Sequence, residues 1–280
     1  MSPVKTWAGL SLDRPRIMGV VNVTPDSFSD GGKFATRDAV LRQGERLIAE
    51  GADILDIGGE STRPGARPVS PQEEQDRILP VLEAGLPVPL SIDTRHPETM
   101  RAAHQGFGAQ IWNDVTALTH SPDSFQTAID LNVCLCLMHM QGQPQTMQAN
   151  PTYDDVVADV TASLVDQATA LTQAGKAPQD ICLDVGIGFG KTLSHNLQLL
   201  KHLDQFTALP FAHLLGVSRK SFIDKAMVSA GRGAVRAEAR LPGSLAAAVL
   251  AYERGCRLFR VHDVAATRQA LEIAHQVIMK

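Results

Sequence analysis

The chain has 280 residues, of which 44% are hydrophobic and 20% are charged, and its 26 Lys and Arg against 30 Asp and Glu give a net charge of −4. This composition is ordinary for a globular protein and excludes a disordered or fibrous chain. The length allows one large domain or two small ones. The slight negative charge argues against a generally basic nucleic-acid-binding protein.

The apolar runs and the cysteines indicate the cellular compartment in which the protein is expected. No apolar run approaches the ~18–20 residues that span a bilayer, and residues 1–16 lack the apolar core of a signal peptide. The cysteines lie in or beside apolar runs, as small buried residues of a reducing compartment do; they are Cys134, Cys136, Cys182 and Cys256. A zinc or redox site at Cys134 and Cys136 has weak support, because no His or Cys pair stands at metal-ligand spacing. We expect a cytoplasmic protein that binds neither a membrane nor nucleic acid.

Short apolar runs alternate with helical patterns along the whole chain. Eight strands are predicted, over residues 17–23, 53–57, 89–92, 111–114, 133–139, 181–184, 213–218 and 257–262. Each is followed by a helical segment, over about 38–50, from 73, 97–105, 123–131, 153–174, from 194, 243–255 and after 262. The helix near 73 has a clear start signal, because Ser70 is a favoured N-cap, Pro71 suits the first helical position and Glu73 completes a capping box.

This alternation favours parallel strands joined by crossover helices. Eight units match a (β/α)8 TIM barrel, which typically needs about 250 residues; a doubly wound open sheet is the alternative. No composition shift marks a second domain, so we expect residues 16–280 to form the barrel and residues 1–15 a small lid over its N-terminal end. The connections 24–37 and 60–70, after the first two strands, are long, and 231–240 lengthens a third. Long loops in a compact barrel are usually functional.

Polar residues follow every predicted strand, at the end where barrels of this class carry their active sites. They are Asn22, the segment 60–63, Asp93, Asn113 with Asp114, Met138 with His139, Asp184, Ser218 with Arg219 and Lys220, and Arg260 with His262. A single one is readily explained as a strand-terminal cap, but the set predicts a charged pocket for a small ligand. Alternation along a strand places Cys182 with Asp184, and Arg260 with His262, on one face. Leu183 and Val261 then face the helices.

The residue types narrow the chemistry of this pocket. A buried carboxylate such as Asp184 suits a flat heterocycle rich in N–H donors, and Asn113 can read a ring edge because it both donates and accepts. Arg260 and His262 suit an anion such as phosphate. Asn22 with Asp93 nearby could hold Mg²⁺ through oxygen ligands and water.

The segment 185–192 is similar to a phosphate-binding loop at its C-terminal end only. Val185 occupies the first glycine position of the P-loop pattern, and the Gly-x-Gly-x-Gly spacing does not match the dinucleotide fingerprint. We interpret these glycines as letting the backbone approach a flat ligand held by Asp184. His139 has no second histidine at zinc-ligand spacing.

Eight segments in order resemble the bacterial-type dihydropteroate synthase family over nearly the whole chain, and together they are highly specific. They are Asn22-Val-Thr-Pro-Asp-Ser-Phe-Ser-Asp30, Gly58-Gly-Glu-Ser-Thr62-Arg63-Pro-Gly65, Ser91-Ile-Asp93-Thr, Asn113-Asp-Val, Met138-His-Met-Gln-Gly142, Asp184-x-Gly-x-Gly-Phe-Gly-Lys191, Ser218-Arg-Lys220-Ser221 and Arg260-Val-His262-Asp263. The family usually has Pro where Val185 stands and lacks a Pro at the position of Pro242.

The resemblance implies a (β/α)8 barrel that joins a dihydropterin methyl diphosphate to 4-aminobenzoate, with Mg²⁺ and usually as a homodimer. It implies that Asn22 lies on the metal side and that Phe28 and Asp30 belong to a mobile first loop. Carried over, the pterin diphosphate residues are Thr62, Asp93, Asn113, Met138, Asp184, Phe189, Lys220, Arg260 and His262. The aminobenzoate residues are Thr62, Arg63, Pro64, Phe189 and Ser221, with Arg63 also helping to hold the diphosphate. Catalytic roles fall to Asp30, Asp93, Lys220, Arg260 and His262.

Two other functions stay open at this point. One is a pterin-binding methyltransferase domain that serves a corrinoid, which would need neither Arg260 and His262 nor the segment 22–30. The other is a non-catalytic pterin-binding paralogue, which should have lost a loop or a catalytic residue.

Overall fold

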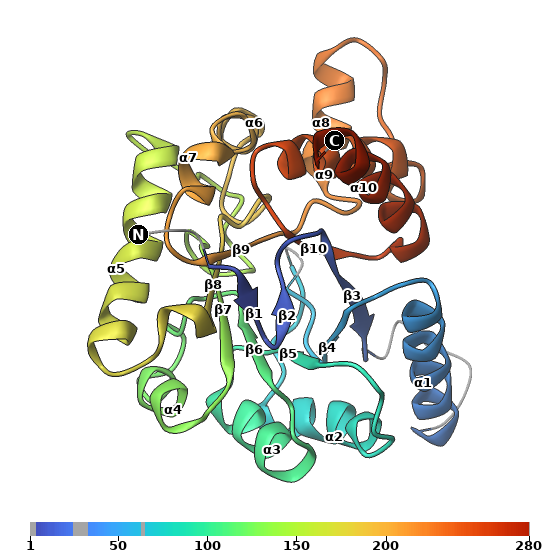
Figure 1. The fold of residues 1–280 in the computed structure, drawn as a ribbon, viewed down its shortest axis with the longest axis vertical. Helices are drawn as coiled ribbons and strands as arrows, with labels where there is room; N and C mark the ends of the chain where they lie inside the picture. Colours follow the sequence, from blue (N-terminus) through green and yellow to red (C-terminus); the bar gives the residue numbers. More distant parts are fainter. Residues whose placement is uncertain (1–3, 25–32, 63–64, 280) are drawn as a thin grey trace.

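Eight parallel strands close into a barrel in the computed structural model, which describes residues 4–24, 33–62 and 65–279 (Figure 1). The order around the barrel is β10-β3-β4-β5-β6-β7-β8-β9. The strands are β3 (Arg16–Asn22), β4 (Ile54–Gly58), β5 (Leu90–Asp93), β6 (Ile111–Asp114), β7 (Cys134–Met138), β8 (Ile181–Asp184), β9 (Ala212–Leu215) and β10 (Leu258–Val261). The TIM-barrel prediction is therefore confirmed, and the alternative of an open, doubly wound sheet is wrong.

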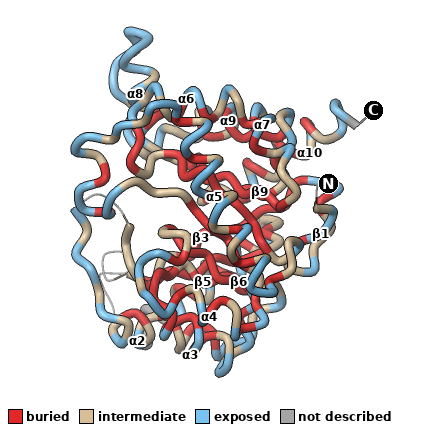
Figure 2. The backbone as a smooth tube through the Cα atoms, turned by 90° about the vertical axis from the view of Figure 1, so that its left-hand side faces the viewer, coloured by how far each residue is buried: buried red, intermediate tan, exposed pale blue. Residues whose placement is uncertain are grey.

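Helices surround the barrel and bury their apolar faces against it (Figures 1 and 2). They are α1 (Lys33–Ala49), α2 (Pro71–Leu82), α3 (Pro97–Phe107), α4 (Ser124–Asp130), α5 (Val156–Gln173), α6 (Leu193–Lys201), α7 (Leu203–Thr207), α8 (Ser221–Ser229), α9 (Leu241–Glu253) and α10 (Val264–Met279). Outward strand residues such as Leu183 and Val261 belong to this main core, as predicted. Among the described residues, no helix is long and apolar enough to cross a membrane.

The interior of the barrel is filled by a second, smaller apolar cluster. It includes Met18, Ile54, Ile111, Cys136 and Cys182, all on the inner face of their strands. A hairpin of β1 (Thr6–Trp7) and β2 (Leu10–Ser11) adds Trp7 and Leu12 to the same cluster. The hairpin thus contributes to the interior packing of the barrel, whereas the division of the chain at residue 15 stays a prediction.

Two local predictions need correction. The connection between β9 and α9 contains α8, which stands out from the body of the molecule (Figures 1 and 2). It forms because Phe222 and Ile223 reach the main core, although the rest of this helix is largely exposed. At α2, Ser70 Oγ accepts a hydrogen bond from the Glu73 amide (3.1 Å). A capping box also needs the Glu73 side chain to accept from the Ser70 amide. The Glu73 carboxylate instead accepts from Arg77 Nη2 (2.5 Å).

We expect Trp7→Ala to lower the free energy of unfolding by about 3 kcal/mol, because Trp7 is only 1% exposed and its loss leaves a cavity in the barrel interior. Urea denaturation measures this. Leu197→Ala, at a half-exposed position on α6, is the control and should change stability by less than about 0.5 kcal/mol. Equal stability of the two variants would contradict the packing role of the hairpin.

Candidate active site

The strand register brings the predicted site residues onto neighbouring positions of the inner barrel face. Asn22 pairs with Gly58, Gly58 with Asp93, and Asp93 with Asn113. On the other side of the barrel, Met138 pairs with Asp184. Because residues paired in a parallel sheet point to the same face, these side chains all face the barrel axis at its C-terminal end.

Arg260 lies at the centre of the charged groups. Its Nε donates to Asp56 Oδ2 (2.6 Å) and its Nη2 donates to Asp93 Oδ2 (2.6 Å). Asn113 Nδ2 donates to the same oxygen of Asp56 (3.1 Å). Four strands thus contribute to one hydrogen-bonded frame, which holds the guanidinium in a fixed orientation.

The buried carboxylates of this frame carry shifted pKa values. Burial raises the pKa of Asp93 to about 7, while Arg260 opposes the shift and the Asp56 carboxylate adds to it. The pKa of Arg260 lies above its usual range, because the attraction of Asp56 and Asp93 outweighs the effect of burial. The guanidinium is therefore a permanent positive charge, and Asp93 is the group whose charge can change near neutral pH.

Asp184 and Lys220 form the second charged group. A methyl group placed on Gly216 would lie 3.8 Å from Asp184 Oδ2 and 3.6 Å from Lys220 Nζ, so both converge beside this glycine. Lys220 Nζ donates to the Ile187 carbonyl (2.5 Å) and lies 4.6 Å from the centre of the Phe189 ring. Burial lowers the pKa of Lys220 to about 8, and Asp184 opposes that shift. Burial also raises the pKa of Asp184, against the pull of Lys220.

The glycines after β8 serve a different contact from the one predicted. Gly186 and Gly190 have positive φ angles, and a Cβ at either would lie 1.9 Å or 2.4 Å from the carbonyl oxygen of His139 or Gln141. These two glycines therefore let the loop after β8 pack directly on the loop after β7. Their close approach is to protein backbone, so the interpretation that they make room for a ligand is wrong for this pair.

Lys191 is a buried cation to which the sequence motifs assign no role of its own. It is 1% exposed, and its ammonium lies 3.0 Å from His139 Nδ1, 3.3 Å from the His139 carbonyl and 3.0 Å from the Phe189 carbonyl. Since an ammonium only donates, Nδ1 accepts. Burial, followed by the charge of Lys191, lowers the pKa of His139 to about 3. Lys191 thus ties the loops after β7 and β8 together.

Asp114 does not join the pocket, although it was counted among the pocket acids. Its carboxylate accepts from the amide and hydroxyl of Thr116 (2.7 and 2.6 Å) and from the amide of Leu118 (3.0 Å). It caps the turn after β6, because its position next to Asn113 sends it to the opposite face of the strand. Asp56, two residues before the end of β4, lies in the pocket with Asp93 instead, and the sequence motifs did not identify it.

At the ends of β9 and β10, Ser218 Oγ lies 3.0 Å from His262 Nδ1. Arg219 instead forms a two-pronged ion pair with Asp263 (2.9 and 2.5 Å). Ser218 therefore orients the His262 ring, whereas Arg219 binds Asp263.

The remaining predicted residues fall on the connections between strands and helices. Thr62 is half-buried after β4, and Ser221 is exposed at the first position of α8. Phe28, Asp30, Arg63 and Pro64 lie outside the described residues. Of the two departures from the family pattern, Pro242 occupies the first turn of α9, where its missing N–H costs nothing, and Val185 packs in the main core.

No group of three or more His, Cys, Asp or Glu residues suited to a metal occurs in the described ranges. Asn22 is half-buried at the end of β3, and its register partner Gly58 has no side chain. A Cβ on Gly58 would lie 3.5 Å from Asp93 Oδ2, and Asn22 and Asp93 are the register partners of this glycine on its two sides. An amide and a carboxylate in these positions fit a cation such as Mg²⁺, which keeps several waters and is often completed by substrate phosphate oxygens.

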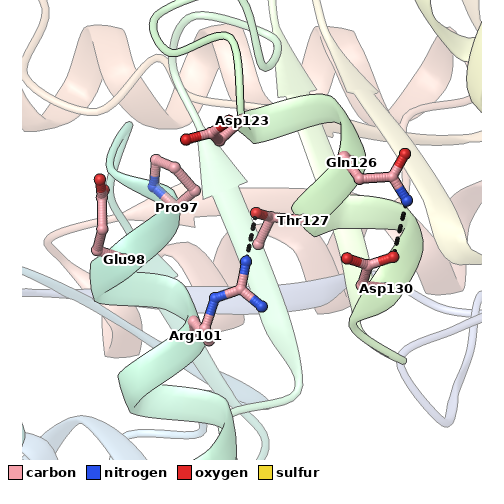
Figure 3. A pocket seen from close by; sticks show the side chains of 7 residues that line it. All are labelled: Pro97, Glu98, Arg101, Asp123, Gln126, Thr127 and Asp130. Atoms are coloured by element: carbon pink, nitrogen blue, oxygen red, sulfur yellow. Dashed lines mark hydrogen bonds between the residues drawn. The ribbon is translucent and has the colours of Figure 1, made fainter.

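A pocket of about 150 Å³ lies between α3 and α4 (Figure 3). Arg101 Nη2 donates to Thr127 Oγ1 there (2.9 Å), and Glu98, Asp123 and Asp130 are its acids. It shares no residue with the charged frame inside the barrel. The candidate site is therefore the barrel mouth, where a guanidinium, an ammonium, carboxylates and an amide converge, as in barrel enzymes that bind small polar ligands.

Comparison with known proteins agrees with this class. The model of the family described as "Pterin binding enzyme" matches residues 18–262. The chain is 49% identical to a dihydropteroate synthase of Neisseria meningitidis serogroup C, over 94% of this chain and 93% of that protein. The chain belongs to the dihydropteroate synthase family of pterin binding enzymes.

Two solved structures extend the similarity to three dimensions. Dihydropteroate synthase of Xanthomonas albilineans with 4-aminobenzoic acid has a TM-score of 0.89 at 48% identity and covers 100% of both chains. The same organism's enzyme in complex with 7,8-dihydropteroate has a TM-score of 0.84 at 46% identity, covering 97% of this chain and 96% of that chain.

The buried Lys191 makes stability depend on pH. Burial lowers its pKa to about 7, opposed by Asp184, from the ordinary 10.5. Between these values the unfolded chain binds more protons than the folded chain, so the free energy of unfolding rises with pH. Relative to Lys191→Met, we expect wild type to gain stability from pH 7 to about pH 9.5, by at most ~1.4 kcal/mol per pH unit.

Urea denaturation at several pH values checks this expectation. Lys201→Met, at the exposed C-terminal end of α6, is the matched control. An identical pH slope in both variants would show that Lys191 contributes no special pH dependence.

Proposed function

We propose that this protein joins (7,8-dihydropterin-6-yl)methyl diphosphate to 4-aminobenzoate and releases 7,8-dihydropteroate and diphosphate. The relatives named above supply the reaction class. The observation that carries the proposal is the frame formed by Arg260, Asp56, Asp93 and Asn113 beside the Asp184–Lys220 pair. It offers acceptors for a heterocycle and cations for an anion in one barrel mouth.

In this proposal the pterin ring binds between Asn113 and Asp184. The buried Asp184 carboxylate accepts paired N–H bonds from the ring, which are strong because one partner is charged. Its Oδ1 also accepts from the Gly186 amide (2.8 Å), which fixes the orientation of the carboxylate. Met138 and Phe189 pack near the ring, and Lys220, held over Phe189, adds a donor.

The diphosphate binds to Arg260 and His262, with Thr62 and Arg63 beside it. Two of the five N–H groups of Arg260 are engaged by Asp56 and Asp93, so the guanidinium keeps donors for phosphate oxygens. The aminobenzoate takes the outer position, lined by Thr62, Arg63, Pro64, Phe189 and Ser221. The proposal also assigns Phe28 and Asp30 of the first loop to this site.

The reaction breaks the bond between the pterin methylene carbon and the diphosphate oxygen, and the bonding electron pair leaves with diphosphate. Arg260 and His262 stabilise the charge of this leaving group. Asp93 stabilises the cation that remains on the pterin methylene. The neutral amine nitrogen of aminobenzoate then donates its lone pair to that carbon, and it loses one proton after the new C–N bond has formed.

Mg²⁺ is part of the proposal, with Asn22 as the ligand supplied by the chain. When bound, the ion would offset the negative charge of the diphosphate. The strand register supports this assignment, because Asn22 and the Asp93 carboxylate lie on the two sides of Gly58 and bring oxygen ligands together at the barrel mouth. An anionic substrate binds there more readily with a cation.

The protein acts as a homodimer in the cytoplasm in this proposal. Leu250 on α9 and Ile273 and Val277 on α10 are 51%, 64% and 74% exposed. Apolar side chains on two adjacent helices suit a second copy of the chain.

All four cysteines are free, as expected in a reducing compartment. Residues 1–15 and 16–280 serve as barrel lid and catalytic barrel.

We expect the purified protein to release diphosphate only when the pterin diphosphate, 4-aminobenzoate and Mg²⁺ are all present. A coupled diphosphate assay measures the release, and chelation of Mg²⁺ should abolish it. Pterin binding without release would instead support a non-catalytic pterin-binding protein. Methyl transfer to a corrinoid would support the methyltransferase.

We expect Asp184→Asn to weaken pterin binding at least about 10-fold, because a buried donor pair loses its charged acceptor. Calorimetric titration with the pterin measures the affinity. Asp180→Asn is the control, because Asp180 immediately precedes β8 whereas Asp184 ends this strand. This variant should bind the pterin as wild type does. Unchanged affinity in Asp184→Asn would refute the assigned role of Asp184.

A further inference from the structure

Asp56 lies inside the barrel, one inward position below the end of β4. It is fully buried, and its neighbours Leu55 and Ile57 point outward into the main core. A fully buried carboxylate is costly unless charged or polar partners compensate for lost water. Its presence in an otherwise apolar strand therefore calls for a specific partner.

The partners of Asp56 are two residues to which the proposed reaction assigns different parts of one substrate. Its Oδ2 accepts from Arg260 Nε (2.6 Å), assigned to the diphosphate, and from Asn113 Nδ2 (3.1 Å), assigned to the pterin ring. One oxygen atom from β4 thus connects β10 with β6. No direct bond between Arg260 and Asn113 exists among the described residues, so Asp56 sets their relative position.

Asp93 cannot replace Asp56 in this role. Asp93 holds Arg260 through Nη2 (2.6 Å), but it lies one inward position nearer the barrel mouth and is itself assigned to the substrate. With Asp93 as the sole partner, the guanidinium could rotate about that single contact. Asp56 engages the Nε edge, and two contacts on different edges of a planar group fix its plane.

We propose that Asp56 is a positioning residue for the reaction: it aligns the diphosphate-binding Arg260 with the pterin-binding Asn113 from beneath the substrate. This inference rests on the proposed function. Asp56 acts through its two partners, so its loss should impair the pterin diphosphate and leave 4-aminobenzoate, which binds to other residues, largely unaffected.

Two variants separate the parts of this role. Asp56→Asn keeps an acceptor oxygen of the same shape and loses only the charge. Asp56→Ala removes both the charge and the bonds. Ser91→Ala is the matched control, because Ser91 is the register partner of Asp56 on β5, is equally buried, and its hydroxyl has no hydrogen-bond partner in the described part of the chain.

In steady-state assays we expect Asp56→Ala to raise the KM for the pterin diphosphate about 10-fold or more and to lower kcat. The KM for 4-aminobenzoate should stay within about 2-fold. Asp56→Asn should recover part of the loss, and Ser91→Ala should match wild type. Thermal unfolding of each variant identifies loss of folded protein, and Asp56→Asn supplies the result if Asp56→Ala does not fold.

A binding measurement without turnover completes the test. Calorimetric titration of inorganic diphosphate with Mg²⁺ into wild type, Asp56→Asn, Arg260→Met and the double variant gives a double-mutant cycle. We expect Asp56→Asn to change the affinity for diphosphate in the protein that keeps Arg260. In the protein that already carries Arg260→Met, Asp56→Asn should have no further effect. Additive effects would overturn the proposal, and so would parallel changes in both KM values.

The two hypotheses fail in different ways. If wild type binds diphosphate and pterin but does not turn over, the proposed function fails, while the cycle still decides the role of Asp56. If wild type turns over and the Asp56 variants lose activity only in proportion to folded protein, Asp56 is a structural ion-pair partner and the positioning role is refuted.

Discussion

The guanidinium of Arg260, held between the carboxylates of Asp56 and Asp93, is the contact around which the barrel mouth is organised. Buried carboxylates require a cation or several donors nearby. Two acids on adjacent strands can therefore be accommodated inside the barrel because a third strand places an arginine between them. The same pairing engages two N–H groups of Arg260, and its remaining N–H groups can donate to a ligand.

The two loops opposite this frame are joined by equally close contacts. Gly186 and Gly190 leave no space for a side chain against the backbone after β7, and the Lys191 ammonium adds bonds to carbonyls on both loops. Phe189 lies between these fixed points, and Lys220 lies over its ring. Contacts on both sides of Phe189 therefore restrict the position of its ring.

The sequence was sufficient to predict the barrel, because eight apolar runs alternate with helical patterns and a parallel strand needs such a crossover. It was also sufficient to locate most polar residues at the strand ends, since this position is a property of the fold. It did not reveal Asp56, which lies within a strand and is identified only by its partners 57 and 204 residues away. Asp114 was misassigned because a one-residue difference in register decides which face a side chain occupies.

Lys191 and α8 were missed for a different reason. A lysine after a glycine-rich loop is normally interpreted through a sequence motif such as the P-loop. The burial of the Lys191 ammonium instead follows from the contact between the loops after β7 and β8. The first turn of α8 contains two apolar residues that reach the core, Phe222 and Ile223, but the glycines and arginines that follow the helix obscure its pattern. In both cases tertiary packing supplied the information that local patterns lack.

The charge balance of the site residues determines how the site can bind an anionic ligand. Arg260 is largely neutralised by two carboxylates, and Lys220 faces Asp184 across Gly216, so the described groups present little net positive charge to a diphosphate. In the proposed function, binding of such an anion comes from directed hydrogen bonds and from the proposed Mg²⁺ rather than from a simple excess of basic residues. This arrangement suits a site that must release diphosphate after each turnover, since a strongly cationic pocket would retain it.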